Sequence, residues 1–303
     1  MSSLQFYICV PRHYEPIKEP FSFSELPVEG HDPTETSSAS DRTLSFRSTE
    51  VIYDYDTRVY RGIFTDQDGQ ETKAVCKFVL DAGTQVKRRF QREAKMYQTK
   101  LRDLQGYCIP RFYGLYSGQV VGNNSMCMIL EDCGESVGTY DTISMEWCIM
   151  AVRILMAIHK RGVQHNDFHP RNLIIDNFEK PTRLVVVDFE HATQHECRRE
   201  LDLDLYTLPP FMCEFNCNEL WDAADNTLVW TPSSVCIFGG FVSVRDFTTP
   251  EELLALAPDY DDRYEPEEAL KRAKAVIRGY LRQWKDRKPY VLGNVRETLL
   301  PVK

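Results

Sequence analysis

One eight-residue stretch limits what this chain can fold into more than any other part of it. Residues 165–172 bring an acid, two amides and two imidazoles together, in the order His165, Asn166, Asp167, Phe168, His169, Pro170, Arg171 and Asn172. The apolar run 173–175 follows, and a second apolar run, 184–187, leads into Asp188, Phe189 and Glu190. Short apolar runs of this kind are typical of buried strands. We therefore expect two short strands that each present polar groups at one end.

These side chains suit phosphoryl transfer. One carboxylate can orient an attacking hydroxyl, while an amide and a second carboxylate hold Mg²⁺ against the phosphates. The catalytic loop and metal-binding turn of the protein-kinase-like superfamily have the pattern H-x-D, four residues, N, then D-F-G. This chain resembles that pattern, with Asn172 five residues after Asp167 and with Asp188 and Phe189 further along. Glu190 stands where that pattern has Gly. It could add a carboxylate to the metal or cap the turn, and we favour the cap.

An upstream lysine and glutamate fit the same resemblance. Lys77 alternates in phase with Val75 and Val79 in a run of period two, so it lies on an apolar face, where a charge is costly unless an opposite charge meets it. Glu93 lies at the edge of an apolar helical stripe within residues 85–104, for which Thr84 is the expected N-cap. The resemblance implies that these two side chains pair and order the nucleotide phosphates.

The resemblance also implies a hinge after the last strand of the first lobe. Leu130 would be the gatekeeper, and backbone groups at Glu131 and Cys133 would bind an adenine edge. Asn172 and Asp188 would hold Mg²⁺, and Asp167, aided by His169, would act on the acceptor. The expected cofactors are therefore ATP and Mg²⁺.

The expected fold is α+β and bilobal, like that of protein kinases. Period-two runs over 46–80, a turn at 66–69 and two further runs around the turn at 122–124 predict a five-stranded antiparallel sheet with one long helix. Helical spacing over 144–161 and 267–284 predicts a mainly helical second lobe. We divide the chain into an N-terminal extension (1–45), a first lobe (46–131) and a hinge with a second lobe (132–303). The proline-rich extension is expected to drape over a neighbour or stay mobile.

Four departures from the kinase pattern bear on function. Ile52, Asp54 and Thr57 stand where the phosphate-binding loop of the family has glycines, which allow backbone amides to approach phosphates. Asn166 replaces an arginine that receives regulatory phosphates. His169 stands where protein kinases have lysine, as in the aminoglycoside and choline kinase branches. After Asp188 there is no A-P-E element to anchor a peptide-docking segment.

The predicted function is transfer of the γ-phosphate of ATP to a hydroxyl, with a small hydroxylated molecule favoured as acceptor over a protein. Alternatives are a pseudokinase that binds nucleotide or a partner without turnover, an atypical protein Ser/Thr kinase, and the same fold used for nucleotidylation. The whole chain resembles compact kinase-like proteins of fungi.

Composition limits the partners and the compartment. A net charge of −9 argues against nucleic acid as the main partner, because phosphate binding needs a basic face. No basic N-terminal region precedes an apolar core and no run reaches the length of a membrane span, so we expect a cytoplasmic protein without a membrane partner. The ten cysteines lack paired metal-type spacing and are expected to be reduced thiols.

Overall fold

The computed structural model describes residues 3–7, 20–26, 43–54, 57–80, 82–258, 260 and 264–287. The chain divides into two compact units, Met1–Cys197 and Arg198–Lys303. Within the described residues the fold is mixed, with six α-helices and one large sheet, in agreement with the predicted α+β class. None of the helices in that part of the chain is long and apolar enough to cross a bilayer.

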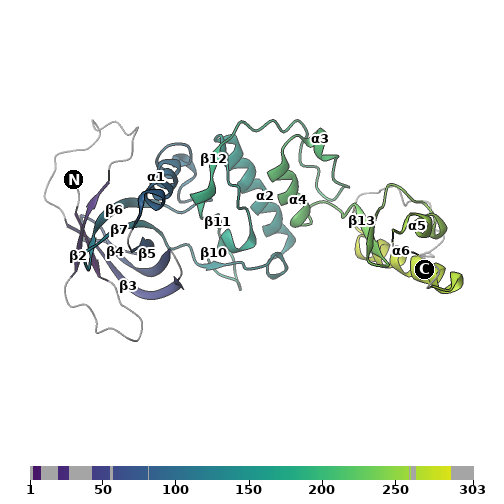
Figure 1. The fold of residues 1–303 in the computed structure, drawn as a ribbon, viewed down its shortest axis with the longest axis horizontal. Coiled ribbons are helices and arrows are strands. Elements are labelled where there is room, and N and C mark those ends of the chain that lie inside the picture. Colours follow the sequence, from purple (N-terminus) through teal and green to yellow (C-terminus); the bar gives the residue numbers. More distant parts are fainter. Residues whose placement is uncertain are drawn as a thin grey trace. The chain divides into compact units, whose positions relative to one another are not determined.

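Seven strands of the first unit form a closed barrel in the order β1-β2-β6-β7-β5-β4-β3 (Figure 1). Their bounds are β1 Ser3–Tyr7, β2 Phe21–Glu25, β3 Thr43–Asp54, β4 Arg58–Thr65, β5 Glu71–Val79, β6 Phe112–Val120 and β7 Asn123–Glu131. All neighbours are antiparallel except β1 and β3, which run parallel from the pair Ser3 and Thr43. Because β1 pairs with both β2 and β3, the sheet closes on itself.

The predicted five-stranded sheet corresponds to β3–β7, but the count of five is too low. Two additional strands come from the region that we assigned to the extension, and they close the sheet. Their apolar side chains enter the barrel interior, where Phe6 packs against Phe46 and Phe78 with ring centroids 5.6 and 5.4 Å away. The predicted mobility concerns residues 1–2, 8–19 and 27–42, which lie outside the described part of the chain.

The helix α1, Thr84–Gln98, lies beside β6 and β7 (Figure 1). It differs from the prediction at both ends. Gly83, not Thr84, is the N-cap and makes no side-chain cap, while the helix stops at Gln98 instead of Leu104 because the chain continues into a 3₁₀ turn, Arg102–Leu104. The predicted apolar stripe of this helix is buried as expected, including Phe90 and Tyr97.

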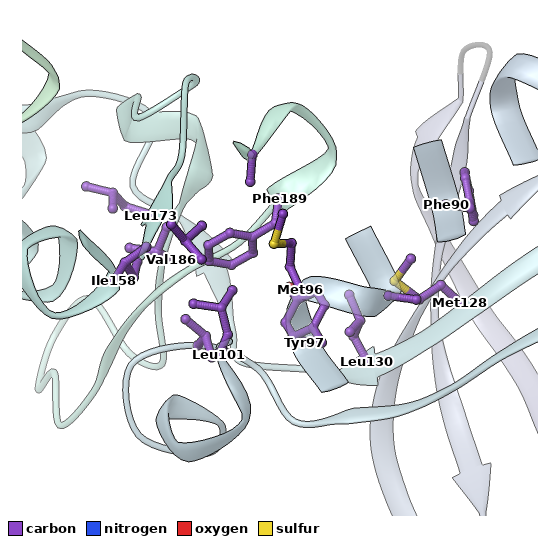
Figure 2. Close-up of a cluster of buried hydrophobic side chains, with 14 of the residues drawn as sticks. Phe90, Met96, Tyr97, Leu101, Met128, Leu130, Ile158, Leu173, Val186 and Phe189 are labelled. Carbon is purple, nitrogen blue, oxygen red and sulfur yellow. The ribbon is translucent and has the colours of Figure 1, made fainter. Parts of the chain in front are cut away.

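A second core of the first unit joins α1 to the segments that carry the catalytic loop. These segments are β8 Glu135–Ser136, α2 Met145–Lys160, β9 Val163–Gln164, β10 Leu173–Ile175, β11 Leu184–Val186 and β12 Thr193–Gln194. Figure 2 shows Met96 and Tyr97 of α1 gathered with Phe189, Leu173 and Val186. Tyr97 meets Phe189 edge to face at 5.4 Å. Because Phe189 follows Asp188 directly, this packing sets where Asp188 lies.

The second unit has a core of its own. Its elements are α3 Met212–Phe215, α4 Asn218–Asn226, β13 Ser234–Ile237, β14 Gly240–Ser243, α5 Pro250–Leu256 and α6 Pro266–Gln283. The predicted helices at 144–161 and 267–284 match α2 and α6 to within about a residue at each end. The bilobal kinase arrangement and the boundaries 1–45, 46–131 and 132–303 stay predictions.

Candidate active site

Lys77 of β5 joins two carboxylates that lie far apart in the sequence. Its Nζ donates to Glu93 Oε1 at 2.8 Å and to Asp188 Oδ1 at 2.7 Å. Strand alternation puts Ala74, Cys76 and Phe78 in the barrel interior and leaves Lys77 on the opposite face of the sheet. The pairing of Lys77 with Glu93 is the one expected from the sequence.

Glu93 also holds the turn that carries Asp188. The Glu93 side chain is only 1% exposed, and its Oε1 accepts a hydrogen bond from the backbone N–H of Phe189 at 3.2 Å. Asp188 has a left-handed backbone, with φ 69°, and caps the 3₁₀ turn Phe189–His191. One buried carboxylate therefore fixes both the lysine and the turn.

Burial and charge act against each other on the three ionisable groups. Burial lowers the pKa of Lys77, but the neighbouring Glu93 and Asp188 carboxylates outweigh it and raise the pKa above its usual value. Burial raises the pKa of Glu93, although Lys77 opposes the rise. For Asp188, burial raises the pKa, but the charge and hydrogen bond of Lys77 outweigh it and lower the pKa below its usual value. Lys77 thus keeps Asp188 ionised, as a metal ligand must be.

The catalytic loop 165–172 is anchored to the Asp188 turn through His165. This fully buried ring has its Nε2 2.9 Å from the Val187 carbonyl, and its Nδ1 accepts from the Asp167 N–H at 3.2 Å. Such a pair of contacts requires the tautomer protonated on Nε2. His165 therefore orders Asp167 and Asp188 relative to each other.

Both carboxylate oxygens of Asp167 are engaged. Arg171 Nη2 donates to Oδ1 and Oδ2 at 2.7 and 2.9 Å, and Asn172 Nδ2 donates to Oδ2 at 3.0 Å. Asn172 Nδ2 also donates to the Asp167 backbone carbonyl at 2.8 Å. His169 is exposed, and its Nε2 lies 3.8 Å from Asp167 Oδ1.

A cavity of about 650 Å³ opens between the barrel and the catalytic segments of the first unit. Lys77, Asn172 and Asp188 line it together with the predicted hinge residues Leu130, Glu131 and Cys133. The apolar side chains of Val59, Val75 and Ile174 add to its walls. A volume of this size suits a small-molecule or nucleotide ligand. Asp167, Glu93 and His169 are not among its lining residues.

The hinge is held by two arginines that the sequence prediction did not include. Arg183 pairs with the Glu131 carboxylate at 2.6 Å. Arg61 of β4 pairs with Asp132 at 2.9 Å, and its Nη2 donates to the Gly134 carbonyl at 3.0 Å. Cys133 donates weakly to the Glu131 carbonyl at 3.6 Å, and burial raises the pKa of its thiol to about 12. The thiol is thus neutral and unreactive at neutral pH.

Glu190, in the position of the family glycine, pairs with a helix. Its carboxylate lies 3.0 Å from Arg89 Nη1, and its backbone carbonyl accepts from Arg92 at 2.9 Å. Both arginines belong to α1. Glu190 also lines the cavity. The substitution for glycine therefore ties the Asp188 turn to α1, a contact that no local pattern in the sequence indicates.

The residues expected to bind Mg²⁺ present suitable oxygen atoms. Lys77 binds Asp188 through Oδ1, so Oδ2 is the atom that a cation would use. Asn172 lines the cavity and directs its Nδ2 to Asp167, so Oδ1 is the amide atom that could bind a cation. A carboxylate and an amide oxygen match the hard oxygen ligands that Mg²⁺ prefers.

The sequence comparisons agree with this geometry over part of the chain. Residues 111–195 match the sequence model of the phosphotransferase enzyme family called APH. This stretch contains Asp167, Asn172 and Asp188, and it confirms the resemblance to the protein-kinase-like superfamily and its aminoglycoside and choline kinase branch. The match supports a phosphotransferase of that superfamily. No curated protein matched the chain.

Proposed function

We propose that the protein is an ATP- and Mg²⁺-dependent phosphotransferase of bilobal kinase-like fold, in which residues 46–131 form the first lobe and residues 132–303 the hinge and second lobe. The observation that carries the proposal is the meeting of Lys77 with both Glu93 and Asp188, which lie 16 and 111 residues away in the sequence. A half-buried lysine paired with a helix glutamate, next to a cavity and a candidate metal-binding aspartate, is the arrangement that orders nucleotide phosphates in kinases.

Each residue that matches the kinase pattern then has a role. Lys77, oriented by Glu93, contacts the α and β phosphates, and backbone groups at Glu131 and Cys133 bind the adenine edge beside Leu130. Asn172 and Asp188 would hold Mg²⁺, which supplies charge neutralisation at the phosphates. Asp167 orients the acceptor hydroxyl and takes its proton. His169, exposed next to Asp167, serves the acceptor side.

The acceptor that we propose is a small hydroxylated molecule. His169 in place of lysine and the missing A-P-E element support it, as does the match to a phosphotransferase family. The carboxylate of Glu135, which lines the cavity, pairs with Arg61 at 2.9 Å. A cytoplasmic site of action goes with this proposal.

A pseudokinase is the second candidate, and two observations favour it. Both oxygens of Asp167 accept hydrogen bonds from Arg171, so Arg171 competes with an acceptor hydroxyl for the carboxylate that would take its proton. The side chains of Ile52 and Thr57, where glycines would let backbone amides approach phosphates, also line the cavity.

Two aspartate variants distinguish these candidates, because the roles of the two carboxylates differ. Asp167→Asn should keep binding of Mg·ATP, so ATP at about 100 times its Kd still stabilises the fold by about 2.7 kcal/mol. Asp188→Asn should lose most of that stabilisation. Turnover, followed as slow ATP hydrolysis and with a panel of hydroxylated metabolites and peptides, should fall in both, and for Asp167→Asn by about 10²–10⁴-fold.

The matched control is Asp103→Asn, which removes an exposed carboxylate that is not among the cavity-lining residues. It should leave both ATP stabilisation and turnover unchanged. A wild-type melting temperature that ignores millimolar Mg·ATP would contradict the nucleotide site. Unchanged hydrolysis in Asp167→Asn would contradict the role given to that residue, and labelling of peptides alone would contradict the small acceptor.

A further inference from the structure

Two histidines and a cysteine of the first unit meet at the C-terminal end of α2, in a cluster that phosphotransfer does not use. His159 lies in the last turn of α2 and is 3% exposed, while His195 and Cys197 are half-buried in the segment after β12. One ligand atom from each side chain lies within 4.8 Å of those of the other two. The two imidazole rings meet with centroids 4.8 Å apart and planes inclined by 71°.

The backbone brings the three side chains together by a short strand pair. After α2 the chain reverses at Gly162, with φ 74°, and enters β9. β9 pairs with β12 so that Gln194 lies opposite Val163, and the N–H of His195 donates to the Gly162 carbonyl at 3.0 Å. His195 therefore lies beside the last turn of α2. Cys197 follows two residues later, with its Sγ within 4.8 Å of a ring nitrogen of each histidine.

The donor set selects the kind of ion. Two imidazole nitrogens and one thiolate sulfur suit borderline or soft metals, whereas Mg²⁺ and Ca²⁺ take oxygen ligands. In a tetrahedral zinc site the ligand atoms lie roughly 3.3–3.8 Å apart, as follows from bonds of about 2.0–2.3 Å. From their largest separation, the three ligand atoms need to approach one another by no more than about 1–1.5 Å, a shift that side-chain rotation supplies.

We propose that His159, His195 and Cys197 bind a zinc ion, with water or another donor in the fourth position. The ion would act as a structural clamp. β9 leads directly into the catalytic loop, and β12 follows the Asp188 turn. A metal ion bound beside the start of β9 and the end of β12 would therefore fix the two chain segments that carry the catalytic groups. Asn166 already links these segments, because its Nδ2 donates to the His191 carbonyl and to Thr193 Oγ1, both at 2.9 Å. The proposal does not depend on phosphotransfer.

Metal content and affinity test the site in the full-length protein without a polyhistidine tag. Purified without chelators, wild type should carry about one zinc ion per chain. Stripped protein should rebind Zn²⁺ with a higher melting temperature, and Co²⁺ should give the visible bands of a tetrahedral ion with a thiolate-to-cobalt charge-transfer band. Cys197→Ser should abolish that band. Cys197→Ser and His195→Gln should each weaken zinc binding by at least about 10–100-fold.

The matched controls are Cys108→Ser and His191→Gln, which replace the same residue types in the same unit outside the cluster. Both should keep the wild-type zinc affinity. The proposal is overturned if wild type holds no zinc and binds Zn²⁺ no better than the two ligand variants do, or if it takes up Cu²⁺ but not Zn²⁺. Because Co²⁺ spectra of wild type alone report thiolate coordination, absence of the charge-transfer band overturns the site even if a ligand variant fails to fold.

Discussion

At the scale of single residues, Lys77 decides the charge balance of the cavity. Glu93 and Asp188 both depend on it, since each is buried to a degree that disfavours a free carboxylate. Removing one partner leaves an uncompensated charge in a poorly solvated place. The resulting loss of stability is larger than the net contribution of the ion pair to stability. The lysine is therefore both a candidate phosphate ligand and a structural counter-charge.

Lys77→Met should lower the free energy of unfolding by about 3–5 kcal/mol at pH 7. In wild type the pKa of Asp188 is lowered, so its ionisation stabilises the fold above its unfolded pKa and this contribution is lost as pH falls through the lower, folded-state pKa. Without Lys77, burial raises the pKa of the Glu93 and Asp188 carboxyls. Their protonation in acid then removes the uncompensated negative charge that destabilises the variant. The stability difference from wild type should therefore shrink between pH 7 and pH about 4.

Urea unfolding of both proteins at the two pH values measures this. Lys73→Met is the matched control, because Lys73 is an exposed lysine of the same strand. It should change stability by no more than about 0.5 kcal/mol at either pH. A gap for Lys77→Met that stays constant or widens in acid would mean that the lysine does not stabilise the ionised carboxylates.

Site residues with an unusual local sequence context were predictable from the sequence. Residues that take part in the site only through contacts made in the fold were not. A lysine on an apolar face and a glutamate on the edge of an apolar helical stripe are each costly alone, and that cost made Lys77 and Glu93 predictable. Arg61, Arg89 and Arg171 look like ordinary surface side chains in the sequence. Their partners Asp132, Glu190 and Asp167 become evident only in the fold, except that Arg171 stands four residues after Asp167.

At the scale of elements, the two N-terminal strands complete the barrel. β1 lies between β2 and β3, and its Phe6 contacts aromatic rings from several strands: Phe23, Phe46, Tyr60 and Phe78. Strands of five residues separated by proline-rich segments give too short a period-two pattern to stand out. The longer strands of the same sheet were predictable because alternation extends over eight or more residues in each.

Phe6→Ala should destabilise the first unit by about 3–5 kcal/mol, because it removes a fully buried ring from the centre of the barrel interior. Tyr7→Ala is the matched control, since the adjacent side chain points out of the barrel and is exposed. It should cost about 0.5 kcal/mol or less. Urea unfolding of the two variants compares them directly. Equal effects would mean that β1 covers the barrel without contributing to its core.

At the scale of the whole molecule, the described residues form cores that do not share members between the two units. Ala192 is the last buried residue in the sequence that belongs to the two cores of the first unit. Val235 is the first buried residue that belongs to the core of the second unit. The cavity is lined only by residues from Ile52 to Glu190. Sequence patterns predicted α6 but not a division at residue 197, because contacts within a compact unit, unlike helical spacing, leave no periodic signal.

Separate cores predict that the two units respond to different perturbations. Ile277→Ala removes a fully buried side chain from the core of the second unit and should cost about 2–5 kcal/mol there. Ile158→Ala makes the same change in the first unit and serves as the matched variant.

In calorimetry, Mg·ATP should raise the temperature of the transition that Ile158→Ala lowers, because bound ligand stabilises only the unit that holds the cavity. The transition lowered by Ile277→Ala should not move with ligand, and the Kd for Mg·ATP should stay within about twofold of wild type in that variant. A single transition that moves with both substitutions and with the ligand would show instead that the two units unfold as one cooperative body.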